Sequence, residues 1–414
     1  MRLLFASVLA FAFVSSEASV LLRFDGVRML AFVAALGTLL ALALARDPHL
    51  RPREAGTVAV LALLLAVILA ADATKGAVDP IDYKVALVLP LLLFAPNLAR
   101  SSAGQDVAEL VWRLLTVYVL VTAVSAALAV PEFLLRGRPE LARLDFTGSL
   151  VGHAGLCVVY LLATLARMAR AVSAFGLAAH AALAATAATM VLLTGTRTSL
   201  VTIGIYLAFD VAAARERAGA FPRLALAVLG VLTAVTAYTL LVSDDFLERL
   251  LVGSSEDWSS GRATSQLHWL ALAVGEPLGL GFGAVRELLR DGRPALDGVS
   301  LLEWPHNEPL RFFVEAGLPG LLFVGVLMAR LARLAIVAAR DETRPVPRAL
   351  MLAIAADMLG QSLFQNYFNS IYHAVALLSV LVTLAASVEP VPEPTGTRRR
   401  PALRPDLPGE AATA

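Results

Sequence analysis

Charged residues are scarce in this chain of 414 residues: Asp, Glu, Lys and Arg make up only 16% of it, while 58% is hydrophobic. An average soluble domain has about a quarter charged and roughly half apolar residues. The mean hydropathy of +0.75 points in the same direction. The composition therefore excludes an ordinary soluble protein and predicts a membrane protein.

Cysteine is nearly absent, since Cys157 is the single one and lies inside an apolar stretch. One thiol cannot form a disulfide framework or a cysteine metal site. The sequence also has no histidine and carboxylate spacing typical of a metal cage, and no serine-nucleophile motif. The net charge of +1 gives no indication of nucleic-acid binding. We expect no metal, no cofactor and no nucleic-acid partner.

Long apolar runs dominate the chain, and most reach or approach the ~20 residues that cross about 30 Å of hydrocarbon. Their length and their leucine and alanine content predict helices, because backbone groups in lipid must be satisfied internally. We expect an all-α polytopic membrane protein of about 12 transmembrane helices. The expected spans are 3–22, 27–45, 58–71, 85–94, 107–130, 154–166, 171–193, 200–214, 224–242, 318–331, 349–358 and 374–386.

The first apolar segment has two interpretations. Arg2, an apolar stretch to Val14 and small residues up to Ser19 are also typical of a cleaved signal peptide. Glu17 is awkward at a cleavage site, which favours a retained first helix.

The connections between the expected spans differ in charge on the two sides of the membrane. With a cytoplasmic N-terminus, the cytoplasmic connections carry most arginines and the outer connections carry most aspartates and glutamates, the positive-inside pattern. Both termini are then cytoplasmic. We expect one domain over residues 1–388 and a proline-rich, disordered cytoplasmic tail over 389–414.

The longest interruption of the apolar pattern, residues 244–305, falls on the outer side. It contains three tryptophans and the glycine-rich sequence GEPLGLGFGAV, and we expect ordered short helices on the membrane face. Gly279, Gly281 and Gly283 superficially resemble a dinucleotide fingerprint. No strand-helix-strand context surrounds them, so close packing of a turn is the favoured interpretation.

Two arginines and one histidine on the outer side are the candidate reactive groups. Arg197 lies in LLTGTRTSLV, where one span ends and another begins, and a charge near membrane depth usually marks a ligand or a polar cavity. Arg262 directly precedes an expected short helix, whose N-terminus favours anions. His306 lies at a helix start set by Pro305 and Pro309.

Two arginines and a histidine suit a reaction in which a diphosphate leaving group is displaced. Arginine forks hold phosphate oxygens, and a neutral imidazole accepts the proton of an attacking hydroxyl. Further along the same helix, Arg311 and Glu315 are spaced i and i+4, while Gly317 and Gly320 permit close approach of neighbours.

At these residues the chain resembles the family of O-antigen ligases and O-antigen polymerases of bacterial inner membranes. The motifs, in the family's order, are LLTGTRTSL, SGRATSQLHWLALAVGEPLGLGFG and HNEPLRFFVEAGLPGLL, with a weaker match from Phe146, FTGSLVGHAGLCVVYLL. Together they cover about residues 146–330. Two departures are a threonine, Thr196, where many members have a serine before the arginine, and His153 where relatives often carry an asparagine; we interpret His153 as a packing residue.

The resemblance implies a lipid-linked-sugar glycosyltransferase fold with one long, partly helical periplasmic loop. It implies a metal-independent transfer of a glycan from undecaprenyl diphosphate to an acceptor hydroxyl, on lipid A-core for a ligase. The family's essential groups fall on Arg197, Arg262 and His306. We expect Thr196, Asn307, Arg311 and Glu315, in the same motifs, to contact substrate.

Three alternatives remain at this point. A polymerase of O-antigen or exopolysaccharide repeats and a protein O-oligosaccharyltransferase would use the same chemistry on other acceptors. A secondary transporter also fits a chain with about 12 spans and intramembrane charges, but the two similar halves typical of transporters are not visible. Candidate partners besides membrane lipids are a chain-length regulator and a flippase.

Overall fold

The structure is a computed structural model and describes residues 2–15, 25–46, 52–75, 85–101, 104–136, 150–194, 196–213, 262–290, 305–340, 343–365 and 371–388. Every regular element within these ranges is a helix. The expected all-α class is therefore confirmed for the described part of the chain. The expected span 224–242 and the tail 389–414 lie outside the described residues.

The helices overlap all the other expected spans. In chain order they are α1 (Arg2–Ser15), α2 (Asp25–Arg46), α3 (Pro52–Lys75), α4 (Val88–Ser101), α5 (Gly104–Arg136), α6 (Leu150–Met168), α7 (Ala174–Leu193), α8 (Arg197–Ala213), α11 (Arg262–Gly275), α12 (Ala284–Arg290), α13 (Glu308–Arg340), α14 (Pro345–Phe364) and α15 (Ile371–Val388). Short helices are predicted within 244–305, and the described residues of this segment form α11 and α12.

Four helical segments of the described chain are long and apolar enough to cross a membrane: Ala55–Lys75, Val107–Leu128, Ala174–Leu193 and Glu308–Arg340. Shorter apolar segments lie in α1, α2, α4, α6, α8 and α15. These findings support a helical membrane protein, whereas the count of about 12 spans remains a prediction.

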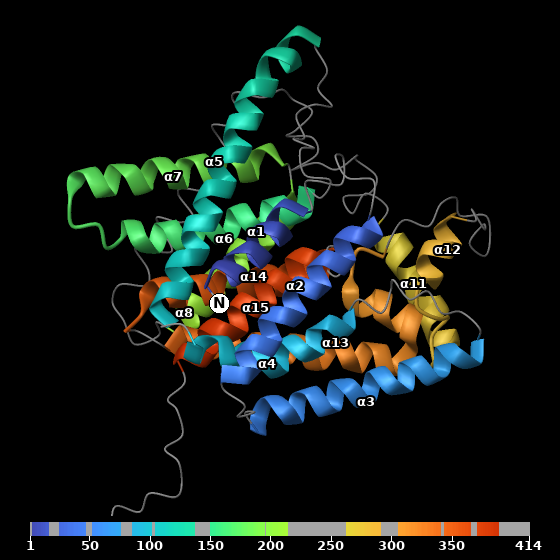
Figure 1. The fold of residues 1–414 in the computed structure, drawn as a ribbon. Coiled ribbons are helices and arrows are strands. Elements are labelled where there is room, and N and C mark those ends of the chain that lie inside the picture. Colours follow the sequence, from blue (N-terminus) through green and yellow to red (C-terminus); the bar gives the residue numbers. More distant parts are fainter. Residues whose placement is uncertain are drawn as a thin grey trace, which may run out of the picture.

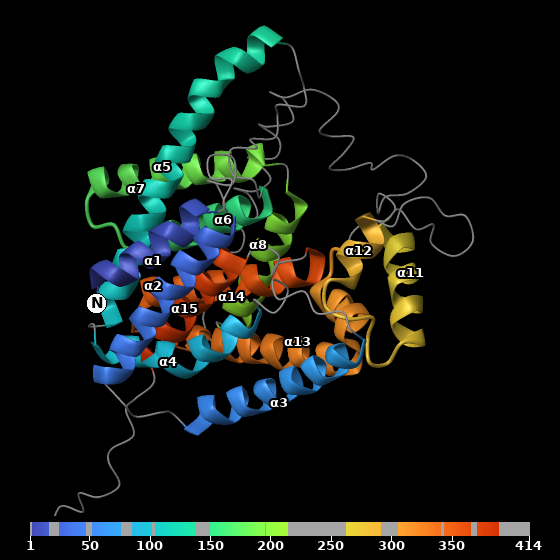
Figure 2. The same ribbon diagram turned by 45° about the vertical axis from the view of Figure 1, so that its right-hand side comes forward.

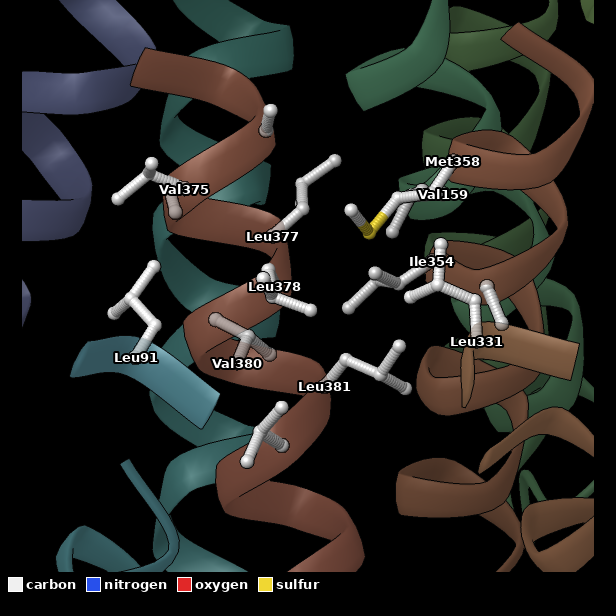
Figure 3. Close-up of a cluster of buried hydrophobic side chains, with 14 of the residues drawn as sticks. Leu91, Val159, Leu331, Ile354, Met358, Val375, Leu377, Leu378, Val380 and Leu381 are labelled. Atoms are coloured by element: carbon white, nitrogen blue, oxygen red, sulfur yellow. The ribbon is translucent and has the colours of Figure 1, made fainter. Parts of the chain in front are cut away.

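Helix α14 forms the centre of the bundle. It packs against α13, α8 and α6, while α15 lies between α14 and α4 (Figure 1). Residues from Ala349 to Ser362 of α14 are buried on all sides, as expected of a helix that is apolar around most of its circumference. In the close-up, Leu377 and Leu381 of α15 point toward Ile354 and Met358 of α14 (Figure 3).

The outer helices turn apolar side chains outward. Leu63 of α3 is 66% exposed and Val121 of α5 is 59% exposed, and other large apolar residues on both helices share these faces. Contiguous exposed apolar surface of this kind is unusual on a soluble monomer, and hydrocarbon is its natural environment. The faces of α3 and α5 therefore mark the lipid-facing perimeter.

Helix α13 has 33 residues and is broken near its start. Gly317 has φ 62 and ψ −153, and Pro319 follows it. The short segment before the break packs with α11 and α12 around Trp269, a small core separate from the main one. The long segment after the break runs through the bundle beside α3 (Figure 2).

At the far end of α13, polar contacts join the helix ends. Arg348 Nη2 lies 2.6 Å from Asp210 Oδ1 at the end of α8, and Arg348 Nε donates to the Ala339 carbonyl at 3.1 Å. Arg344 Nη1 donates to the Ser387 carbonyl of α15 at 3.0 Å. The bundle thus has an arginine-rich end, and α11 and α12 lie at the opposite one (Figure 1).

Candidate functional site

His306 lies two residues before α13, at the end of the bundle that carries α11 and α12. Its φ is 45, the only positive value among the described non-glycine residues. A non-glycine residue in this region costs about 1–3 kcal/mol and persists where its surroundings hold it, often at functional sites. The imidazole Nδ1 lies 3.2 Å from Oε1 of Gln365, at the end of α14. The helix start predicted from Pro305 and Pro309 is confirmed.

Asn307 fixes this turn to two helices. Its Oδ1 accepts from the Leu310 backbone N–H at 2.9 Å, a helix N-cap, and its Nδ2 donates to the Leu363 carbonyl of α14 at 3.0 Å. Both bonds are to backbone groups, so Asn307 couples the start of α13 to the end of α14. Its expected contact with substrate remains a prediction.

Arg311 and Glu315 are both buried in the first segment of α13. The Arg311 Nε lies 2.9 Å from Glu308 Oε2, and the guanidinium lies 5.0 Å from the ring centre of Phe312. Glu308 lies three residues before Arg311, so the helix places the two side chains on one face. Glu315, four residues after Arg311, lies on the same face, as its spacing predicted. Substrate contact by Arg311 and Glu315 also remains a prediction.

The break in α13 is closed by the glycine-rich loop, and we call Pro277–Gly283 together with Val314–Leu318 the glycine clasp. Pro319 has no N–H for the Glu315 carbonyl, and the break at Gly317 frees the Val314 carbonyl. The Leu280 N–H donates to the Val314 carbonyl and the Gly281 N–H to the Glu315 carbonyl, both at 2.8 Å. In return, Leu318 N–H donates to the Pro277 carbonyl at 2.9 Å. The Val314 and Glu315 carbonyls and the Leu318 N–H thus find their partners in the loop.

The clasp requires glycine at its closest approaches. Gly279, Gly281 and Gly283 have φ of 76, 110 and 91. A Cβ on Gly279 would lie 2.4 Å from the Glu315 carbonyl oxygen, and two residues after the clasp a Cβ on Gly320 would lie 2.4 Å from the carbonyl oxygen of Phe312. The interpretation of these glycines as residues of a closely packed turn is confirmed.

The C-terminal end of α3 is hydrogen-bonded to the glycine clasp. Lys75 Nζ donates to the Leu278 carbonyl at 2.9 Å and also to that of Gly279. Phe282 N–H donates to Oδ2 of the fully buried Asp72 at 3.3 Å. Residues more than two hundred positions apart therefore fix the position of α11 and α12.

Lys75→Met is expected to lower the thermal stability slightly. The substitution removes hydrogen bonds from an ammonium group, but Lys75 is exposed, so solvent screening limits the loss to about 1 kcal/mol. The measurement is the melting temperature in detergent. Arg113→Met, which removes an exposed ion pair with Glu109 away from the clasp, is the control; an equal decrease in both variants would contradict a specific role of Lys75.

Arg197 and Arg262 are the first residues of α8 and α11, and their side chains lie outside the described part of the structure. One turn after Arg262, Gln266 Nε2 donates to the Pro305 carbonyl at 3.2 Å, so α11 begins close to His306. The helix start expected at Arg262 is confirmed. Thr196 precedes α8, is half-buried and donates its N–H to Thr194 Oγ1 at 3.3 Å.

Helix α8 runs antiparallel to α14. At one end Asp210 pairs with Arg348, and toward the other end a Cβ on Gly360 would lie 3.1 Å from Thr202 Oγ1. Arg197 lies five residues before Thr202 and Gln365 lies five residues after Gly360, so the start of α8 lies at the end of α14. The N-termini of α8, α11 and α13 thus converge around His306. Their partial positive charges favour an anion.

Sequence reasoning missed a polar face of α14 formed by Asp357, Gln361 and Gln365. Gln361 Nε2 donates to Asp357 Oδ1 at 2.6 Å inside the bundle. A Cβ on Gly155 of α6 would lie 2.2 Å from Gln361 Nε2, so a larger residue at this position would displace the Gln361 amide. These three polar residues recur at every fourth position of an otherwise apolar run, and this helical spacing could have indicated a common face.

The neighbouring His153 of α6 is a packed, hydrogen-bonded residue of the core. It is 1% exposed, and its Nδ1 lies 2.7 Å from Tyr118 Oη. Cys157 Sγ lies 3.6 Å from the other ring nitrogen. These contacts confirm the interpretation of His153 as a packing residue.

In a comparison with protein families, residues 181–325 match a family described as O-antigen ligase. This interval contains Arg197, Arg262 and His306 and excludes the weaker motif that begins at Phe146. The resemblance seen in the sequence is therefore confirmed over this interval. No curated protein matches the chain.

Proposed function

We propose, from the membership of residues 181–325 in the O-antigen ligase family, that the protein is a glycosyltransferase that ligates a glycan to a lipid acceptor. The donor is a glycan on undecaprenyl diphosphate and the acceptor is a hydroxyl of lipid A-core. The observation that carries the proposal is the convergence of three helix N-termini on His306, at the end of a lipid-facing bundle. This arrangement suits an anionic leaving group beside a proton acceptor.

The proposed reaction is a direct displacement. The acceptor oxygen attacks the anomeric carbon while the bond from that carbon to the diphosphate oxygen breaks. His306 accepts the hydroxyl proton, and the electron pair of the broken bond leaves with undecaprenyl diphosphate. The guanidinium groups of Arg197 and Arg262 hold this diphosphate, and the N-termini of α8 and α11 add to the favourable field.

The proposed site faces the periplasm of a bacterial cell. The arginine-rich end of the bundle, with Arg344 and Arg348, lies at the opposite end of α13 from His306. Lys and Arg concentrate on the cytoplasmic side of inner-membrane proteins. The proposal therefore includes a multi-pass inner-membrane protein with cytoplasmic termini and a periplasmic segment over 244–305.

Arg262→Ala is expected to lower the rate of transfer by at least about a hundredfold, as for loss of one group that stabilises developing negative charge. Arg262→Lys should recover only part of this loss, because an ammonium group keeps the charge but lacks the bidentate fork. The measurement is consumption of the lipid-linked donor in proteoliposomes. Arg286→Ala is the control, since Arg286 is an exposed arginine of α12 on the same segment.

Wild-type activity of Arg262→Ala would contradict the role of this arginine in holding the diphosphate. An equal loss in Arg286→Ala would instead indicate that the segment responds to any loss of positive charge. The corresponding pair at the other helix start, Arg197→Ala and Arg197→Lys, should give the same order of activities.

A further inference from the structure

We propose that Gln365 is a positioning residue that sets the tautomer of His306. The inference rests on the proposed function, because it concerns the nitrogen that accepts the proton. Gln365 Oε1 lies 3.2 Å from His306 Nδ1. An amide oxygen can only accept a hydrogen bond, so Nδ1 carries the hydrogen and Nε2 is the basic nitrogen of the neutral ring.

Gln365 is itself held in place by the end of α14. It is the C-cap residue, its φ is −148 and ψ is 171, and its N–H donates to the Gln361 carbonyl at 2.7 Å. Two residues earlier, the Leu363 carbonyl accepts from Asn307. The end of α14 therefore contacts the His306–Asn307 turn at two places, through Gln365 and through the Leu363 carbonyl. These two contacts account for the strained φ of 45 at His306.

A neutral amide is better suited to this position than a carboxylate. Among the described side chains near the turn, the charged ones are Glu308 and Arg311, which pair with each other on α13. Asp357 lies two turns before Gln365 on α14, and Arg197 and Arg262 are the first residues of α8 and α11. A carboxylate at Nδ1 would stabilise the imidazolium, so a smaller fraction of the rings would be neutral and able to accept a proton at neutral pH. It would also offset the positive field that favours an anionic leaving group.

Two substitutions separate positioning from packing. Gln365→Glu keeps the size of the side chain and adds a charge, so the pKa of His306 should rise and the acid limb of kcat/KM should move to higher pH. Gln365→Leu removes the hydrogen bond, and kcat should fall roughly tenfold to a hundredfold, as for other groups that orient a histidine, with an unchanged KM for the donor.

The test is the pH profile of transfer in proteoliposomes for the wild type, both variants and Gln266→Leu. Gln266 bonds to the Pro305 carbonyl beside the same turn, so its variant should keep the acid limb of the wild type. An unshifted acid limb in an active Gln365→Glu variant would overturn the inference, and so would a shift of the same size in Gln266→Leu. A wild-type protein that transfers no glycan would instead contradict the proposed function.

Discussion

His306→Ala is expected to abolish measurable glycan transfer while the protein still folds and inserts. Loss of a positioned general base costs about 10²- to 10⁴-fold in rate. The imidazole contributes little to the fold, because its side chain is only half-buried and Asn307 provides the helix cap. Stability should therefore remain close to that of the wild type.

The measurement is single-turnover transfer in proteoliposomes, together with binding of the lipid-linked donor. We expect donor binding to remain within a few-fold of the wild type, since the proposed mechanism assigns the diphosphate to Arg197 and Arg262. His268→Ala is the matched control: His268 lies on α11 near the same end and is also half-buried. Transfer by His306→Ala at the wild-type rate would exclude His306 as the base.

Gly317→Ala is expected to open the glycine clasp and to inactivate the protein through its structure. A Cβ at this position would lie 2.1 Å from the Pro277 carbonyl oxygen and 2.6 Å from the Gly279 backbone nitrogen. Backbone atoms cannot move aside as a flexible side chain can, and alanine is also strained at φ 62. The combined cost should be at least about 3 kcal/mol, enough to detach α11 and α12 from α13.

The expected result is a lower melting temperature, faster proteolysis between α11 and α12, and loss of transfer. Gly325→Ala is the control on the same helix, because a Cβ there would have nothing within 4 Å of it and alanine favours the helix by about 1 kcal/mol. Gly275→Ala, at the end of α11 beside the glycine-rich loop, is a second control, because a Cβ there would also have nothing within 4 Å of it. A Gly317→Ala protein with wild-type stability and activity would contradict the proposed importance of the clasp.

Local features of the fold were predictable from the sequence. A span is defined by a run of apolar residues, so α3, α5 and α7 follow from hydropathy alone. The start of α13 follows from Pro305 and Pro309, and the turn at Gly279 to Gly283 follows from its glycines. These features depend on neighbours within a few residues.

Features that depend on distant residues were not predictable in the same way. Gln365 lies 59 positions from His306, and Lys75 lies 203 positions from Leu278. Their sequence surroundings contain no motif that indicates these contacts. Arg311 illustrates an intermediate case, since helical spacing allowed partners at i−3 and i+4 and the structure gives the ion pair with Glu308.

The central claim is that a lipid-linked glycan is transferred to a lipid acceptor at the end of the bundle that carries His306. Its most direct test is a reconstituted assay with purified protein and an undecaprenyl diphosphate-linked oligosaccharide, with lipid A-core added to one sample and omitted from the other. The account predicts glycan on lipid A in the first sample and an unchanged donor in the second. Ladders of lengthened donor without lipid A would make the protein a polymerase with the same chemistry, and an intact donor in both samples would contradict the account.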